Sequence, residues 1–262
     1  MRRRIGILLL AVVLTAGFAG HALASLLYNQ NVTPDIIFGS GNANGAFTVD
    51  RSSGVELGLR GKLRYNETGL PENTFNSNGD GTYTFDAGVA PTQSFPTAVW
   101  SFEWSINTDY AGSTGWDLND LKYTLALDSD PTAGTNFLVF DPINDPGPSG
   151  AVFWDHSIGT NDTANGAGLV ASTAEEYASL IADNNVAQQS WKPHWFLPSF
   201  DPNLDATYDL YLAAFDGTTQ VARTEIQIIV GNGAAPVPEP TTLLLLTTSL
   251  IGLAGVRRKT KK

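Results

Sequence analysis

Alternation of apolar and polar residues is the feature that most constrains the fold of this chain. In segment 100–106, Trp, Phe, Trp and Ile occupy every second position, and Ser and Glu fill the others. Because successive strand side chains point to opposite faces, this pattern predicts a strand with one buried and one wet face. Alternation or short apolar runs predict further strands at 47–49, 55–65, 121–128, 137–140, 151–154, 207–215 and 221–230. The turn signal Asn-Gly-Asp-Gly at 78–81 also indicates a hairpin that joins 74–75 to a strand at 82–85.

Turn and cap signals complete the prediction of the fold. Asp216-Gly217 separates the last two strands, which is typical of a β-hairpin. Segment 172–176, Ser-Thr-Ala-Glu-Glu, is a capping box that predicts one short surface helix. Many short strands and one helix indicate an all-β, mainly antiparallel fold. A β-sandwich is favoured, with a jelly roll as the alternative.

Three basic side chains fall on one face of the strand predicted at 55–65. Arg60, Lys62 and Arg64 are separated by single residues, so their side chains share a face. Such a face binds an anion or pairs with neighbouring acids, and the acidic composition of the chain favours the second interpretation.

The N-terminus has the three parts of a secretory signal peptide. Arginines at positions 2–4 precede the apolar segment 5–18, and Ala22-Leu23-Ala24 provides a small-x-small cleavage site. We therefore expect a signal helix in residues 1–24, export across the inner membrane, and cleavage by signal peptidase after Ala24. An uncleaved membrane anchor is the alternative.

Cysteine content and charge exclude several classes of function. The chain has no cysteine, so an exported form has no disulfide framework, thiol nucleophile or thiolate metal site. The formal net charge is −11, although both terminal segments are basic. The body between them is therefore strongly acidic, which disfavours nucleic acid and anionic lipid as partners and attracts cations.

The C-terminal segment 234–262 also has three parts. A linker contains Pro238-Glu239-Pro240, an apolar run at 241–256 predicts a helix, and the basic tail 257–262 begins with Arg257 and Arg258. As a helix the apolar run would measure about 24 Å, which is shorter than the hydrocarbon core of a bilayer. It is a marginal span, with the basic tail expected on the cytoplasmic side.

This order of parts resembles the PEP-CTERM sorting signal of Gram-negative bacteria. The resemblance implies that an exosortase recognises Pro238, Glu239 and Pro240 and removes the helix and tail. It also implies membrane association during sorting, a final location at the cell surface or outside the cell, and a connection with exopolysaccharide and biofilm. The expected organisation is a signal peptide at 1–24, an exported β domain at 25–233, and the sorting signal at 234–262.

Aspartates in the middle of the chain have two interpretations. Asp128, Asp130 and Asp141 lie in a segment rich in oxygen ligands, so a structural calcium site is one interpretation. The spacing is not that of an EF-hand, and Asp side chains also cap turns by bonding to their own backbone. Turn formation is favoured, with no cofactor required.

Aromatic residues provide a second candidate site. Trp191 and Trp195, in the segment Trp-Lys-Pro-His-Trp-Phe, either stack on sugar rings or belong to the core. His156 follows Asp155, which suggests a general base or metal ligand, but a single Asp-His pair more often lies in a loop or at a strand end.

The chain has no nucleophile elbow, zinc-protease motif or phosphate-binding loop. We therefore expect a non-enzymatic exported surface or matrix protein. A secreted carbohydrate-binding or carbohydrate-hydrolysing β-sandwich is the alternative, because paired carboxylates cannot be recognised from sequence alone.

Overall fold

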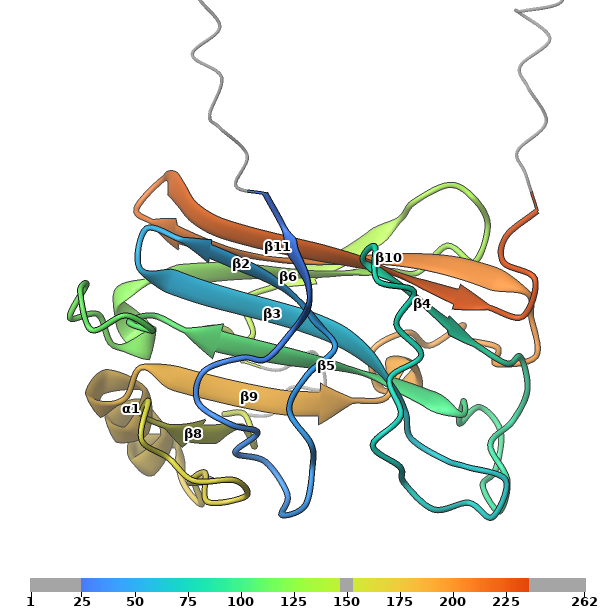
Figure 1. Cartoon of the computed structure of the whole chain (residues 1–262), viewed down its shortest axis with the longest axis horizontal. Coiled ribbons are helices and arrows are strands. Elements are labelled where there is room, and N and C mark those ends of the chain that lie inside the picture. The colour runs from blue at the N-terminus through green and yellow to red at the C-terminus, as the bar shows by residue number, and fades with distance from the viewer. Residues whose placement is uncertain (1–24, 147–152, 236–262) are drawn as a thin grey trace, which may run out of the picture.

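The computed structural model describes residues 25–146 and 153–235, which form two β-sheets packed face to face (Figure 1). Sheet A has the strand order β1-β2-β3-β5-β9-β8, and sheet B has the order β4-β11-β10-β6-β7. The strands are β1 (Leu27–Gln30), β2 (Phe47–Ser52), β3 (Val55–Leu63), β4 (Thr82–Phe85), β5 (Trp100–Asn107), β6 (Lys122–Asp128), β7 (Phe137–Phe140), β8 (Ser157–Gly159), β9 (Val186–Trp191), β10 (Ala206–Asp216) and β11 (Thr219–Val230). The predicted all-β, mainly antiparallel sandwich is confirmed.

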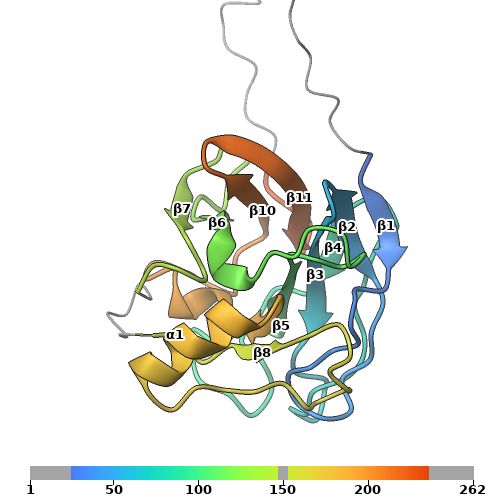
Figure 2. The same cartoon turned by 90° about the vertical axis from the view of Figure 1, so that its left-hand side faces the viewer.

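Among the described residues, one α-helix accompanies the sheets. Figure 2, viewed from the end of the sandwich that carries α1 (Ala174–Asp183), shows this helix beside β8. The hydroxyl of Thr173 accepts a hydrogen bond from the backbone of Glu176, and Tyr177 is the buried residue of the helix. The predicted cap and helix are therefore confirmed. Two short 3-10 helices, η1 (Leu118–Asp120) and η2 (Pro193–Trp195), complete the described elements.

Neighbouring strands pair antiparallel, except that β4 runs parallel to β11. The longest ladder joins β10 to β11, from the pair Ala206–Val230 to the pair Asp216–Thr219. Gly217 lies in the connecting turn with a φ of 59°, which glycine adopts without steric cost. The predicted hairpin is therefore confirmed.

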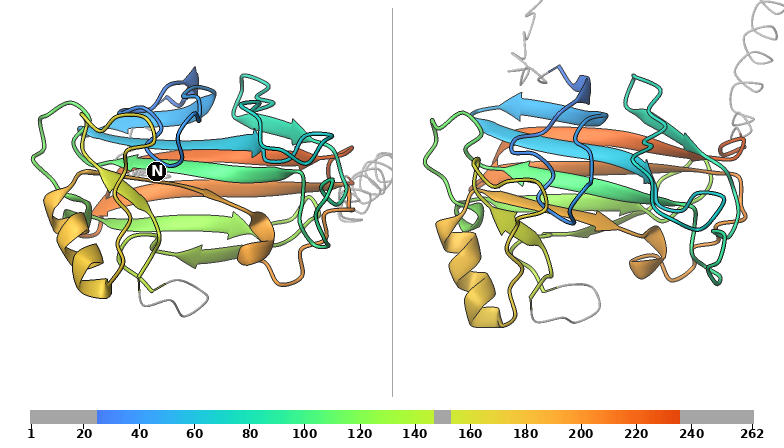
Figure 3. Two further views of the ribbon diagram at one scale, coloured as in Figure 1. Left: turned by 90° about the horizontal axis from the view of Figure 1, so that it is seen from below. Right: turned by 60° about the horizontal axis from the view of Figure 1, so that its bottom comes forward.

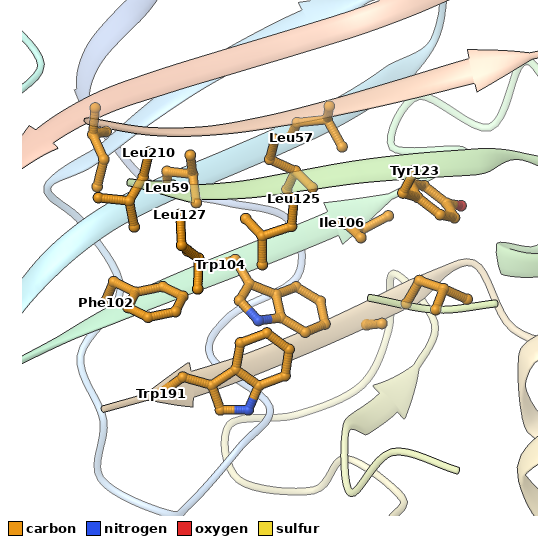
Figure 4. Close-up of a cluster of buried hydrophobic side chains, with 14 of the residues drawn as sticks. Leu57, Leu59, Phe102, Trp104, Ile106, Tyr123, Leu125, Leu127, Trp191 and Leu210 are labelled. Atoms are coloured by element: carbon orange, nitrogen blue, oxygen red, sulfur yellow. The ribbon is translucent and has the colours of Figure 1, made fainter. Parts of the chain in front are cut away.

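The hydrophobic core lies between the sheets. Figure 4 shows Leu57 and Phe102 of sheet A close to Leu125 and Leu210 of sheet B, with Trp104 and Trp191 in the same cluster. All of these side chains are buried. Removing one large apolar side chain from water stabilises a fold by roughly 1.5–3 kcal/mol, so this cluster accounts for a fold without disulfides.

The outer face of sheet A is also covered. Every residue of β5 is buried, so the prediction of one wet face is wrong for this strand. Segment 31–46 crosses the face in front of β3 and β5 (Figure 1), and its Ile36 and Phe38 pack with Phe47 and Val49 of β2. The amide of Asn107 donates to the carbonyl of Thr33 at 2.7 Å. Local alternation cannot reveal such a cover, because the covering segment is distant in sequence.

The basic face of β3 lies beneath this cover. Arg60 is fully buried and forms an ion pair with Glu103 at 2.5 Å, and the Lys62 ammonium lies 3.5 Å from the same carboxylate. The rings of Phe47 and Phe75 flank the Arg60 guanidinium at 4.1 and 3.9 Å. Pairing with acids is therefore confirmed for Arg60 and Lys62, in a site closed to an external anion.

One predicted strand is not formed, and several predicted segments lie outside the described residues. The strand predicted at 151–154 is not formed where it is described: Phe153 and Trp154 lie outside strands, and Trp154 stacks on Phe140 at 5.6 Å. Residues 151–152, the signal segment 1–24 and the helix predicted at 241–256 lie outside the described residues. Within 25–146 and 153–235, helices are too short or too polar to cross a membrane.

Candidate functional site

A groove crosses the outer face of sheet B and has a volume of about 410 Å³. Its floor is formed by outward-facing residues of β10 and β11, where odd-numbered positions alternate with buried ones. Tyr28 of β1 borders the groove, as does Phe137 of β7. Its polar and aromatic lining residues include Tyr28, Phe137, Asp209, Tyr211, Arg223, Glu225 and Gln227. We call this site the sheet B groove.

Side chains on the floor of the groove hold one another in place. The Arg223 guanidinium lies 3.8 Å from the centroid of the Tyr211 ring and donates to Glu225 at 3.0 Å. The ring of Phe137 meets that of Tyr211 edge to face, with centroids 5.4 Å apart. This contact passes over β6, where the small Ala126 lies opposite Tyr211. The Tyr211 ring is thus fixed from two sides.

Acidic groups outnumber basic ones in the groove. Asp80, Asp209 and Glu225 line it together with the single cation Arg223. The hydroxyl of Thr82 and its backbone N–H donate to Asp80, and these bonds lower the pKa of that carboxyl. A surface of this charge favours neutral or cationic ligands over anionic ones.

The chemistry of the groove suits recognition of a polar ligand with apolar faces. Tyr28 is 39% exposed, and a tyrosine ring offers a flat apolar face together with a polar hydroxyl. The amide of Gln227 donates to Asp209 at 2.9 Å, so two planar polar groups lie beside the rings. Amides and carboxylates provide donors and acceptors for ligand hydroxyl groups.

The two tryptophans predicted from sequence are separated by the structure. Trp191 is 3% exposed and packs against Trp104 at 5.3 Å and Trp154 at 5.1 Å. The prediction that Trp191 contacts a ligand is therefore corrected, because β9 directs this ring into the core. Trp195, on η2, is 53% exposed but is not among the residues lining the sheet B groove.

The predicted calcium ligands are not gathered in one place. Asp128 ends β6, whereas Asp141 accepts from the backbone N–H of Tyr123 near the start of that strand. Asp128 accepts from the N–H groups of Asp130 and Asn136, as in turn formation. In the described part of the chain, no three acidic, histidine or cysteine side chains are grouped to hold a metal ion. One site shared by Asp128, Asp130 and Asp141 is therefore not formed.

His156 lies in a closed aromatic cluster. It is fully buried, with the ring of Trp104 at 4.7 Å and that of Trp154 at 5.2 Å, and its Nε2–H donates to the carbonyl of Pro142. Burial lowers its pKa from 6.5 to about 3, so the imidazole is neutral at physiological pH. Without access to solvent, His156 cannot act on an external substrate.

Comparison with protein families identifies the C-terminal segment. The model described as the PEP-CTERM protein-sorting motif matches residues 236–259. The chain carries this sorting motif. The suspected resemblance is thus confirmed, and the motif implies a secreted protein that is processed by exosortase-type sorting machinery and directed to the cell surface or the extracellular space. Comparison with curated proteins found no match, and comparison with solved structures found none either.

The sorting motif contains the residues predicted to guide processing. Pro238, Glu239, Pro240, Arg257 and Arg258 fall within the matched range. They lie outside the described residues, as do Ala22 and Ala24 of the signal cleavage site. The match covers a small part of the chain and lies outside the β-sandwich.

Sequence reasoning anticipated only part of the groove. The alternation in 221–230 already placed Arg223, Glu225 and Gln227 on one face, opposite the buried residues. Tyr28 and Phe137 had no comparable signal, because they reach the groove only through the pairing of distant strands. A tyrosine on the polar face of an alternating strand, such as Tyr211, was the sequence signal that could have indicated the groove.

Proposed function

We propose that this protein is a non-enzymatic, exported surface or matrix protein that binds exopolysaccharide through the sheet B groove. The observation that carries the proposal is the arrangement of Tyr28 and Tyr211 beside the paired side chains of Asp209 and Gln227. Aromatic rings can stack on the apolar faces of sugars, while planar polar groups bond to sugar hydroxyls. The sorting motif supports the exported location that the proposal requires, because it indicates sorting toward the cell surface or the extracellular space.

Hydrolysis of the bound glycan is the second candidate function. Asp209 lies opposite Gln227, and Glu225 lies opposite Tyr211, so the two carboxylates are diagonal neighbours on one face. Glycoside hydrolysis requires one carboxyl group to be protonated, which an apolar surrounding favours. Glu225 instead has a side chain 58% exposed and paired with Arg223. This environment supports binding over catalysis.

Affinity electrophoresis of the exported protein tests the proposal. Gels would contain neutral, amino-sugar or acidic polysaccharides, or the exopolysaccharide of the producing cells. We expect retardation of the wild-type protein, and a loss of affinity of about tenfold in Tyr211→Ala, equal to ~1.4 kcal/mol. Phe95→Ala is the matched control, because Phe95 is 60% exposed and is not among the groove residues.

The same samples separate the two candidates. Incubation of the protein with each retained polysaccharide should release no reducing ends. Release that disappears in Asp209→Asn or Glu225→Gln would establish hydrolysis in place of simple binding. Migration of the wild-type protein that is unaffected by every polysaccharide would contradict both candidates.

A further inference from the structure

The chain leaves the sandwich at one particular end. Figure 3 shows the C-terminal segment 231–235 at the end opposite α1. Three loop regions lie at the same end: 64–75, 86–99 and 192–205. The N–H of Gly231 donates to the carbonyl of Phe85 at 2.8 Å, and that of Gly88 donates to Pro202 at 2.6 Å. We call this the tail-proximal end.

These loops expose large apolar side chains. Leu70 is 61% exposed, Phe95 60%, Trp195 53% and Leu204 44%. All four belong to the three loop regions of the tail-proximal end. Isolated exposed apolar residues are common, but several at one end of a domain make that end a candidate surface for contact with an apolar partner.

A cation accompanies the aromatic rings here. The Lys192 ammonium lies 5.1 Å from the centroid of the Tyr65 ring and 5.4 Å from that of Trp195. Tyr65 follows β3 and Trp195 belongs to η2, so the contact joins two of the loop regions. Trp, Tyr and Lys are the residues that anchor proteins at the interface between lipid and water.

The length of the linker limits how far this end can lie from a membrane. Residues 236–240 separate the described body from the apolar run 241–256. Fully extended, such a linker spans roughly 20 Å. While the apolar run is inserted in the bilayer, the tail-proximal end must therefore stay close to the lipid surface. The end that carries α1 has no such constraint.

We propose that the tail-proximal end docks on the zwitterionic lipid surface of the membrane while the sorting tail is attached. Leu70, Phe95 and Trp195 enter the interface, and the Lys192 ammonium lies at the level of the lipid phosphates. Glu67 and Glu72 lie in the same loop region, so contact is weak and depends on the tether, which keeps the effective concentration of lipid high. Removal of the tail then releases the domain. This surface is distinct from the sheet B groove.

Fluorescence quenching of the membrane-inserted precursor tests this orientation. Because the chain has no cysteine, Phe95→Cys and Thr218→Cys each accept a single bimane label. Thr218 is exposed in the β10–β11 turn at the opposite end. The precursor would be reconstituted in phosphatidylcholine vesicles whose acyl chains carry a bromine quencher. We expect loss of fluorescence at position 95 and none at position 218.

Surface variants show which side chains make the contact. Leu70→Ser combined with Trp195→Ser should reduce quenching at position 95. Leu169→Ser combined with Val170→Ser is the matched control, because these residues are 55% and 51% exposed and lie outside the three loop regions. The control should leave quenching at position 95 unchanged.

Three results would overturn the proposal. Equal quenching at positions 95 and 218, with the tail inserted, would show that the domain has no fixed orientation. A label at position 95 that is shielded from water but not quenched by lipid would show that the apolar tail itself covers the tail-proximal end. Shielding of the label that increases with the density of protein in the vesicles would instead show that the tail-proximal end contacts a second copy of the chain.

Discussion

His156 shows how strongly a single residue is affected by its place in the core. Its ring is surrounded by tryptophans, and burial holds its pKa at about 3 in the folded protein. In the unfolded chain the pKa returns to about 6.5. Between these values the unfolded state binds a proton that the folded state does not. The contribution of neutral His156 to the free energy of unfolding is therefore fully present above pH 6.5 and is lost as pH falls toward 3.

Measurement of unfolding by denaturant between pH 7 and pH 3 tests this contribution. The free energy of unfolding should fall by about 1.4 kcal/mol per pH unit through His156 alone. His156→Phe should therefore show a shallower pH dependence than the wild-type protein. His194→Gln is the control, because His194 is only partly buried. Equal slopes for wild type and His156→Phe would contradict the assignment.

The Arg60–Glu103 ion pair is the second residue-scale determinant. Both side chains are fully buried, and the guanidinium also donates to the carbonyl of Gly45. Removing one partner leaves an uncompensated charge, so Glu103→Ala should destabilise the protein by about 3–5 kcal/mol. Glu225→Ala breaks an exposed pair and should cost about 1 kcal/mol or less. Thermal unfolding compares the stability of the two variants. A similar loss of stability in both would contradict the importance of the buried Arg60–Glu103 pair.

At the scale of elements, close approach of the sheets depends on a glycine in β3. A Cβ atom on Gly61 would lie 2.8 Å from the Phe85 ring and 3.0 Å from the Ile228 side chain. Both neighbours are buried and cannot move freely. Gly61→Ala should therefore reduce stability by about 1–3 kcal/mol.

A loop glycine provides the control for that prediction. Gly134→Ala would meet the carboxylate end of Asp130, a flexible side chain in an exposed turn, and should change stability little. Denaturant unfolding of both variants measures the difference. A Gly61→Ala variant as stable as Gly134→Ala would show that the sheets can separate without cost.

The elements that sequence could predict are those specified by local pattern. Alternation located β5, β10 and β11, and the capping box located α1, because strand and helix periods are local properties. The short strands β1 and β8 had no such signal, because their positions depend on pairing with distant partners. The turn signal at 78–81 did predict β4, but a local signal could not show that β4 pairs in parallel with the distant strand β11. The cover over sheet A was missed for the same reason.

At the scale of the whole molecule, the candidate site was only partly accessible to sequence. Exposed residues of β11 could be assigned to one face, but Tyr28 joins Tyr211 only after the chain has folded. The aromatic residues of the sequence instead suggested Trp191 as a ligand-binding residue, but its side chain is buried in the core. Residue type alone does not distinguish a ring that binds a ligand from one that packs inside.

Mass spectrometry of the exported protein tests processing at this scale. We predict that the sorting machinery cuts the chain near Pro238–Pro240, within the sorting motif matched at residues 236–259. We expect the mass of a chain that lacks residues 1–24 and the C-terminal tail. In cells without the sorting enzyme, the tail should remain. A mature surface protein that still contains Lys262 would show that the tail is retained.

Binding of the exported protein to exopolysaccharide is the central claim, and its distribution in a biofilm tests that claim most directly. The matrix of cells producing wild type or Tyr211→Ala would be separated from cells and medium, and the protein in each fraction would be quantified. We predict that the wild-type protein is found in the matrix and that Tyr211→Ala moves to the medium while remaining folded. Equal retention of both proteins in the matrix, or a wild-type protein found only in the medium, would contradict the account.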